Sequence, residues 1–249
     1  MRCCVKTLIR DLRKGDKRAA ARLISICENG GEEARAVLKE LGPFARRAQV
    51  VGITGAPGSG KSTLINCLIG LLRARQKKVG VIAIDPSSPL SGGALLGDRI
   101  RMHEHSGDRG VFIRSMATRK GTGGVSRAAG DAARVLDALG LDVVFIETTG
   151  VGQSEIAVRD IVHTVVVVVT PGLGDEVQMM KAGLMEIADV FVVNKGDISN
   201  AEGTARALKK VTGMLPSGRK APPVVVTAAS EGRGVDRLLE ELERQGGRR

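Results

Sequence analysis

The sequence predicts an α/β fold, a doubly wound and mostly parallel sheet with a short helical appendage at the N-terminus. Three observations lead to this prediction. Seven short apolar runs follow position 48, and most are apolar on both faces, as strands covered by helices are. Segments with helical spacing lie between several of these runs, which is typical of a parallel sheet. A chain of 249 residues with 43% hydrophobic residues can bury one main core.

The N-terminal part predicts three short helices. Apolar residues in segment 5–12 recur at the spacing of an amphipathic helix. Asp16 is then a candidate N-cap for a second helix, which a glycine pair closes at residues 30–31. A third helix is expected over residues 31–42. We therefore expect residues 1–47 to form an appendage rather than an independent domain.

The main domain is expected to span residues 48–249. Its predicted strands are 49–54, 78–84, 110–115, 141–147, 163–170, 190–195 and 223–227. Helices are predicted over 61–75, 125–140 and 235–242. These elements alternate along the chain, so the domain should be one continuous α/β unit.

The composition favours an anionic small-molecule partner over nucleic acid. The net charge is +11, but the chain has no Trp, no Tyr and only four Phe, so it lacks the aromatic residues on which single-stranded bases stack. No apolar run approaches the roughly 18 residues of a membrane span. Cys3, Cys4, Cys27 and Cys67 show no metal-ligand spacing. We expect a cytoplasmic protein with reduced thiols and no membrane or nucleic-acid partner.

The strongest motif follows the first predicted strand. The run GAPGSGKS matches G-x-x-x-x-G-K-[ST], and a helical segment comes directly after it. In such a P-loop, backbone N–H groups surround phosphate oxygens, the lysine reaches the β- and γ-phosphates, and the serine hydroxyl binds Mg²⁺. The residues expected to bind nucleotide here are Gly55, Ala56, Pro57, Gly58, Ser59, Gly60, Lys61, Ser62 and Thr63.

A carboxylate follows a second buried strand. Glu147 ends the run LDVVFIE, where a P-loop fold commonly supplies an acid on the Mg²⁺ side. Gly150 fits a turn that senses the γ-phosphate through its N–H, so the residues behind it would form a switch. Asp85 and Asp98 also lie at or near strand-to-loop transitions, which makes them further candidate metal-side acids.

The run NKGD predicts the base that is bound. It follows a late strand and matches N-K-x-D, in which the carboxylate of Asp197 accepts two hydrogen bonds from guanine. Adenine would leave this carboxylate unpaired, so GTP is preferred to ATP. Lys195 would pack its stem along the base, and Asn194 would brace the loop and the base edge. A softer base contact is expected from Ala228, Ala229 and Ser230 after the last strand.

Five segments together resemble one known family. GAPGSGKSTL, IAIDPSSPLSGGALLGDRIRM, ETTGVGQSE, TPGLGDEVQMMKAGLMEIAD and NKGD, in this order, are similar to the MeaB/ArgK family of GTPases. The resemblance extends over nearly the whole chain from about Asp16. It implies metal and switch acids at Asp85, Asp98 and Glu147, with Ser62 of the P-loop. It also implies a chaperone that uses GTP to gate loading or protection of the adenosylcobalamin cofactor of methylmalonyl-CoA mutase, and a homodimer as one assembly.

The expected reaction is in-line attack of water on the γ-phosphate. Lys61 and Mg²⁺ would neutralise the developing charge. Glu147 would be the acid on the Mg²⁺ side, and Gly150 would sense the γ-phosphate through its N–H. Gln153 is a candidate for orienting the water. Two alternatives stay open from the residues: a transport-associated ATPase or kinase, and a nickel metallochaperone GTPase. NKGD disfavours the first, and the scarcity of histidine disfavours the second.

Overall fold

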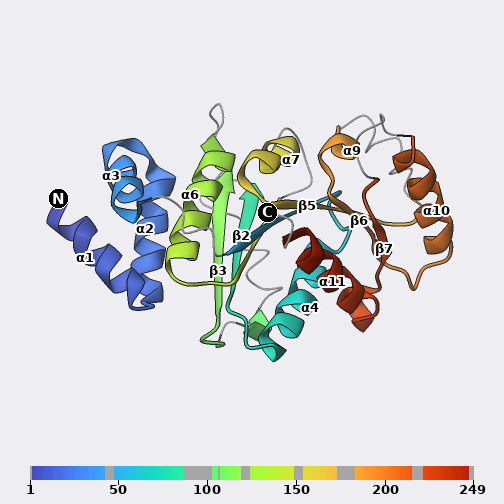
Figure 1. The fold of residues 1–249 in the computed structure, drawn as a ribbon, viewed down its shortest axis with the longest axis horizontal. Coiled ribbons are helices and arrows are strands. Elements are labelled where there is room, and N and C mark those ends of the chain that lie inside the picture. The colour runs from blue at the N-terminus through green and yellow to red at the C-terminus, as the bar shows by residue number, and fades with distance from the viewer. Residues whose placement is uncertain are drawn as a thin grey trace. The chain divides into compact units, whose positions relative to one another are not determined.

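The computed structural model describes residues 2–42, 48–86, 103–105, 107–118, 124–148, 154–172, 183–214 and 221–246. In chain order its helices and strands are α1 (Arg2–Arg13), α2 (Lys17–Asn29), α3 (Gly31–Leu41), β1 (Gln49–Thr54), α4 (Lys61–Ala74), β2 (Val79–Pro86), η1 (His103–His105), β3 (Val111–Thr118), α6 (Gly124–Ala138), β4 (Val143–Glu147), α7 (Ser154–Ala157), η2 (Val158–Ile161), β5 (Thr164–Val169), α9 (Leu184–Ile187), β6 (Val190–Val193), α10 (Ala201–Thr212), β7 (Val224–Val226), η3 (Ala229–Glu231) and α11 (Val235–Gly246) (Figure 1).

The strands form one seven-stranded sheet in the order β3-β2-β4-β1-β5-β6-β7. The pairs β2 with β3, β1 with β5, β5 with β6, and β6 with β7 are parallel. Every residue of β5 is buried, as expected for a strand covered on both faces. The predicted α/β class with a parallel sheet is therefore confirmed, and all seven predicted strands are present.

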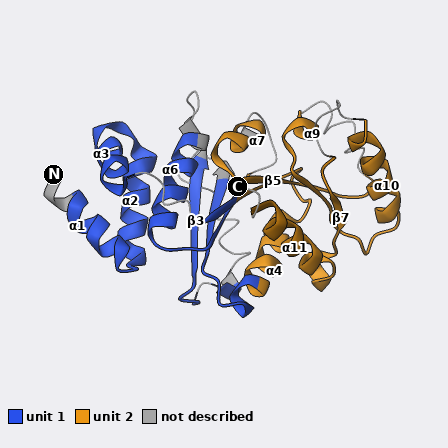
Figure 2. Cartoon of the chain, in the orientation of Figure 1, with its two compact units in different colours: residues 1–50, 72–146 blue, residues 51–71, 147–249 orange. Residues whose placement is uncertain are grey.

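The chain divides into two compact units that interleave along the sequence (Figure 2). One contains residues 1–50 and 72–146, and the other contains residues 51–71 and 147–249. The predicted boundary between residues 47 and 48 stays a prediction. Among the described residues, no helix is both long enough and apolar enough to cross a membrane.

In the first unit, helices α1, α2 and α3 lie together, and α2 and α3 also pack against α6 (Figure 1). The carboxylate of Asp16 caps α2 by accepting a hydrogen bond from the backbone N–H of Arg18 at 2.7 Å, as the sequence predicts. Cys27 of α2 is buried, and burial raises the pKa of its thiol to about 12. Such a thiol stays protonated at neutral pH, so its role is in packing and not in reactivity.

Helix α2 is joined to strand β3 by charged side chains. The Lys17 Nζ atom donates to the carbonyl oxygens of Asp108 at 3.0 Å and Val111 at 2.6 Å. Arg114 of β3 donates to the carboxylate of Glu28 at 2.6 Å. These bonds link residues more than 80 positions apart and fasten the appendage to the sheet within this unit.

The second unit holds the two sequence motifs of greatest interest. Strand β1 leads into α4, and the strands β5, β6 and β7 follow in order along the sheet. The pairs are parallel, so β1, β5, β6 and β7 end at the same edge. The loops after β1, β6 and β7 therefore converge there.

Candidate nucleotide-binding site

The loop from Gly55 to Gly60 connects β1 to α4 and can be built only with glycine at its two ends. Gly55 has a φ of +140°, and a Cβ atom there would lie 2.0 Å from the carbonyl oxygen of Val168. Gly60 has a φ of +88°, and its Cβ atom would lie 2.3 Å from the Nδ2 atom of Asn194. Both positions combine a conformation that favours glycine with close approach of a neighbour. Such a backbone can turn its N–H groups toward an anion.

Lys61 begins α4 and its side chain folds over this loop. The Nζ atom donates to the carbonyl oxygens of Gly55 at 2.8 Å and Ala56 at 3.1 Å. The residue is only 6% exposed, so its charge sits in a largely dehydrated position at the mouth of the loop. A cation held there suits phosphate groups that carry several negative charges.

Ser62 and Glu147 meet at the base of the loop. The Ser62 hydroxyl donates to the Oε1 atom of Glu147 at 2.8 Å, and both residues are buried. Glu147 is the last residue of β4, the strand that lies next to β1 in the sheet. A hydroxyl and a carboxylate are oxygen ligands of the kind that Mg²⁺ prefers, so this pair fits the predicted metal.

Asn194, directly after β6, connects three parts of the site. Its Nδ2 atom donates to the carbonyl oxygen of Ser59 at 2.9 Å. Its Oδ1 atom accepts hydrogen bonds from the hydroxyl of Thr227 at 3.0 Å and from the N–H of Ala229 at 3.1 Å. The residue is 2% exposed. The structure therefore gives Asn194 a bracing position between the phosphate loop and the loop after β7.

The NKGD turn leaves its carboxylate accessible. Lys195 has a φ of +58° and is half-buried, and its carbonyl accepts a hydrogen bond from the N–H of Ile198 at 2.9 Å. The N–H of Gly196 donates to the carbonyl oxygen of Thr227 at 2.8 Å. Asp197 is exposed at the end of the turn, where a ligand can reach it. The backbone hydrogen bonds fix the turn, and the carboxylate of Asp197 stays exposed.

The loop after β7 lies beside Asn194. Ala228 and Ala229 are buried, and Ser230 is exposed. The thiol of Cys67 on α4 donates to the carbonyl oxygen of Ala229 at 3.0 Å. Thr227 and Cys67 were not predicted as parts of the site. Thr227 could have been suspected because it stands just before the predicted contact, whereas nothing in the sequence marks Cys67.

Other predicted site residues fall outside the described part of the chain. These are Asp98, Gly150 and Gln153, together with the side chain of Asp85, whose backbone belongs to β2. The structure thus brings together Lys61, Ser62, Glu147, Asn194 and the residues around them.

The fold and site define a GTPase of the P-loop class. A glycine-rich loop runs from a buried strand into a helix that begins with Lys61 and Ser62, and an N-K-x-D turn lies on the same sheet edge. The family model described as methylmalonyl Co-A mutase-associated GTPase MeaB matches residues 20–246. The chain therefore belongs to the MeaB family of GTPases, and it binds guanine nucleotide and hydrolyses GTP.

Similar proteins agree with this assignment. A Pyrococcus abyssi protein assigned provisionally as a GTPase is 51% identical over 243 residues, covering 96% of this chain and 75% of that protein. The GTPase ArgK of Escherichia coli is 36% identical over 243 residues, covering 94% of this chain and 73% of that protein. A crystal structure described as LAO/AO transport system kinase matches with a TM-score of 0.78 at 28% identity, over 98% of this chain and 76% of that one.

Replacing Gly60 with alanine should disable nucleotide binding. The new Cβ atom would collide with the Asn194 amide, and the positive φ would add a conformational cost of about 1–2 kcal/mol. We expect the affinity for GDP, measured by calorimetric titration, to fall at least about tenfold. Gly70→Ala is the control, because Gly70 lies exposed in α4 with open space around it.

The control variant should keep wild-type affinity and gain about 0.5–1 kcal/mol of stability from the better helix former. Equal GDP affinity in Gly60→Ala and the wild type would contradict the close packing of Gly60 on Asn194.

Proposed function

We propose that this GTPase uses Mg²⁺-bound GTP to gate loading or protection of the adenosylcobalamin cofactor of methylmalonyl-CoA mutase. The proposed nucleotide binding is supported by the Asn194 side chain, which forms hydrogen bonds with both the phosphate loop and the loop after β7. The client is supported by the family description, which names the mutase. The two parts can be tested separately.

Residues 55–63 would hold the phosphates. The loop amides would surround the β- and γ-phosphate oxygens, and Lys61 would leave its two carbonyl partners to pair with them. Ser62 and Glu147 would hold Mg²⁺, with Asp85 and Asp98 as further acids on the metal side. When bound, Mg²⁺ would neutralise part of the charge on the phosphates.

The base would be read by the NKGD turn. Asp197 would accept hydrogen bonds from the N1–H and the exocyclic amine of guanine, and the stem of Lys195 would pack along the base. The buried side chain of Asn194 would hold the P-loop and the loop after β7 together, and its amide would not contact the base directly. Ala228, Ala229 and Ser230 would contribute backbone contacts at the base edge.

Hydrolysis would proceed by in-line attack of water on the γ-phosphate. Lys61 would stabilise charge on the phosphoryl oxygens, and the loop amides would keep those oxygens in place. Gly150 would sense the γ-phosphate, and Gln153 is the candidate for orienting the water. This assignment makes the rate depend mainly on positioning, so a partner that orders the residues around Gly150 would raise it.

We further propose that the protein acts in the cytoplasm, alone or as a homodimer, together with the mutase. The reduced thiols of Cys27 and Cys67 fit a reducing compartment. The difference between GTP-bound and GDP-bound states would decide when the mutase receives or keeps its cofactor.

Changing Asp197 to asparagine should switch the base preference. The amide of Asn cannot accept both guanine donors, so we expect kcat/KM for GTP to fall by about 100-fold or more. Xanthine carries a carbonyl in place of the exocyclic amine, so XTP should become the better substrate. The measurement is phosphate release from GTP, XTP and ATP.

Glu202→Gln is the matched control for Asp197→Asn, because it removes an exposed carboxylate on α10 outside the turn. It should leave the GTP preference intact. An unchanged preference in Asp197→Asn, or equal use of ATP and GTP by the wild type, would refute the assigned role of Asp197.

The client is tested by steady-state phosphate release with and without a methylmalonyl-CoA mutase from the same source. We expect release from GTP, but not from ATP, to rise about fivefold or more when the mutase is added. Lys61→Ala, with the mutase present, controls for contaminating phosphatases. An equal rate of GTP hydrolysis with and without the mutase would reject this client but would not affect the GTPase assignment.

A further inference from the structure

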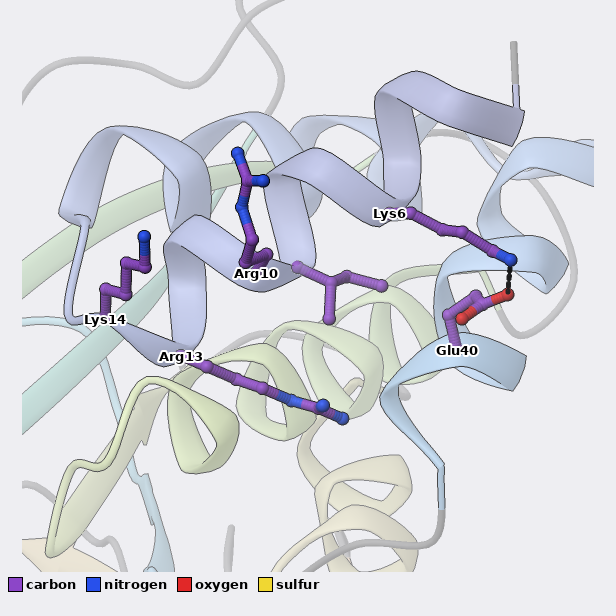
Figure 3. Close-up of a pocket in the computed structure, with 6 residues that line it drawn as sticks. Lys6, Arg10, Arg13, Lys14 and Glu40 are labelled. Atoms are coloured by element: carbon purple, nitrogen blue, oxygen red, sulfur yellow. Dashed lines mark ion pairs between the residues drawn. The ribbon is translucent and has the colours of Figure 1, made fainter.

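Four basic side chains gather on α1 and the turn that follows it, and we call them the α1 basic patch: Lys6, Arg10, Arg13 and Lys14. All four are exposed, whereas Val5, Ile9 and Leu12 of the same helix are buried. Together with Ile9 and Glu40 of α3 they line a shallow hollow of about 500 Å³ (Figure 3). The proposed GTPase mechanism uses none of these residues.

The positive charge of the appendage is concentrated on this helix. Residues 1–14 carry five basic side chains and one acidic one, whereas residues 15–41 carry five of each. Residues 42–47 add two arginines, so residues 1–14 carry most of the excess charge of the appendage. A helix that only covered the core needs a polar outer face, but that face does not need an excess of one sign of charge.

The protein itself neutralises little of this charge. Lys6 Nζ lies 3.9 Å from the carboxylate of Glu40, and Arg10 Nε lies 3.5 Å from that of Asp11, but these pairs are exposed and therefore weak. Among the described residues, Arg13 and Lys14 have no ion-pair partner.

Like charges also face each other along the helix. Lys6 and Arg10 are four residues apart, and Arg10 and Arg13 are three apart, spacings at which like charges repel. The helix dipole favours cations in the last turn, which accounts for Arg10 and Arg13 but not for Lys6 in the middle of the helix. An anionic partner would relieve this repulsion.

We propose that the α1 basic patch is the docking surface for an acidic segment of a partner protein. From Lys6 to Lys14 the patch extends over about 12 Å, the length of roughly four extended residues. Figure 3 shows the end of Arg13 directed away from those of Arg10 and Lys14, so the charges do not converge on one point. A row of separated cations suits several carboxylates along a segment better than a single phosphate group.

Two other anionic surfaces fit less well. Insertion into a lipid surface needs an apolar helix face, but Val5, Ile9 and Leu12 are all buried in the protein. A nucleic-acid strand would bring its phosphates against Glu40 on the rim, and the hollow has no aromatic residue for base stacking. An acidic peptide segment can pass Glu40 without contact, or its backbone N–H groups can donate a hydrogen bond to the Glu40 carboxylate.

The test compares two triple variants of the full chain at physiological ionic strength. Lys6→Glu/Arg10→Glu/Lys14→Glu reverses the patch. Arg206→Glu/Lys210→Glu/Arg237→Glu makes the same change of charge at exposed positions on α10 and α11. The probe is a fluorescein-labelled peptide in which Glu alternates with Ser, read by fluorescence anisotropy, and the same peptide with Gln in place of Glu shows how much binding requires the carboxylates.

The patch variant should bind the acidic peptide at least about tenfold more weakly than the wild type, and the control variant should stay within about twofold. Both should retain wild-type GTP hydrolysis and melting temperature. The proposal is overturned if the wild type does not bind the peptide or if both variants lose affinity equally. It is also overturned if single-stranded DNA, or vesicles of phosphatidylcholine and phosphatidylserine, bind the patch more tightly than the peptide. None of these outcomes bears on the mutase assay.

Discussion

One buried amide holds together the loops of the candidate nucleotide-binding site. The side chain of Asn194 donates to the backbone of Ser59 and accepts from Thr227 and Ala229, so it joins the loops that follow β1, β6 and β7. A buried amide held by three hydrogen bonds is rigid, and the loss of this side chain would leave its buried partners unpaired. The loops that follow β1, β6 and β7 are therefore held in one arrangement by hydrogen bonds within the protein.

This arrangement follows from the parallel sheet. Because β1, β5, β6 and β7 run in the same direction, their carboxyl ends place loops from distant parts of the sequence side by side. Glu147 reaches Ser62 in the same way from the end of β4. The sheet thus positions the loops of the candidate site, and Asn194 joins the P-loop to the loop after β7.

The sequence predicted the strands, the P-loop and the NKGD turn, because each depends on local periodicity or on fixed spacing within one segment. It did not predict α10, whose buried residues include Ala201 and Ala205 and so give a weak apolar stripe. Contacts such as Cys67 with Ala229, which join residues 162 positions apart, have no local signal at all. The same reason explains why the pairing of Arg114 with Glu28 emerged only from the structure.

The central claim is that Asn194 holds the phosphate loop as well as the base loop. The most direct measurement is the affinity of wild type and Asn194→Ala for inorganic tripolyphosphate and for GDP, taken well below the melting temperature of the variant. Tripolyphosphate has no base, so it reports on the phosphate loop alone. Our account predicts that Asn194→Ala lowers the affinity for both ligands, because the Ser59 carbonyl loses its partner. The affinity for tripolyphosphate should fall by roughly fivefold or more. Weaker GDP binding with unchanged tripolyphosphate binding would contradict it.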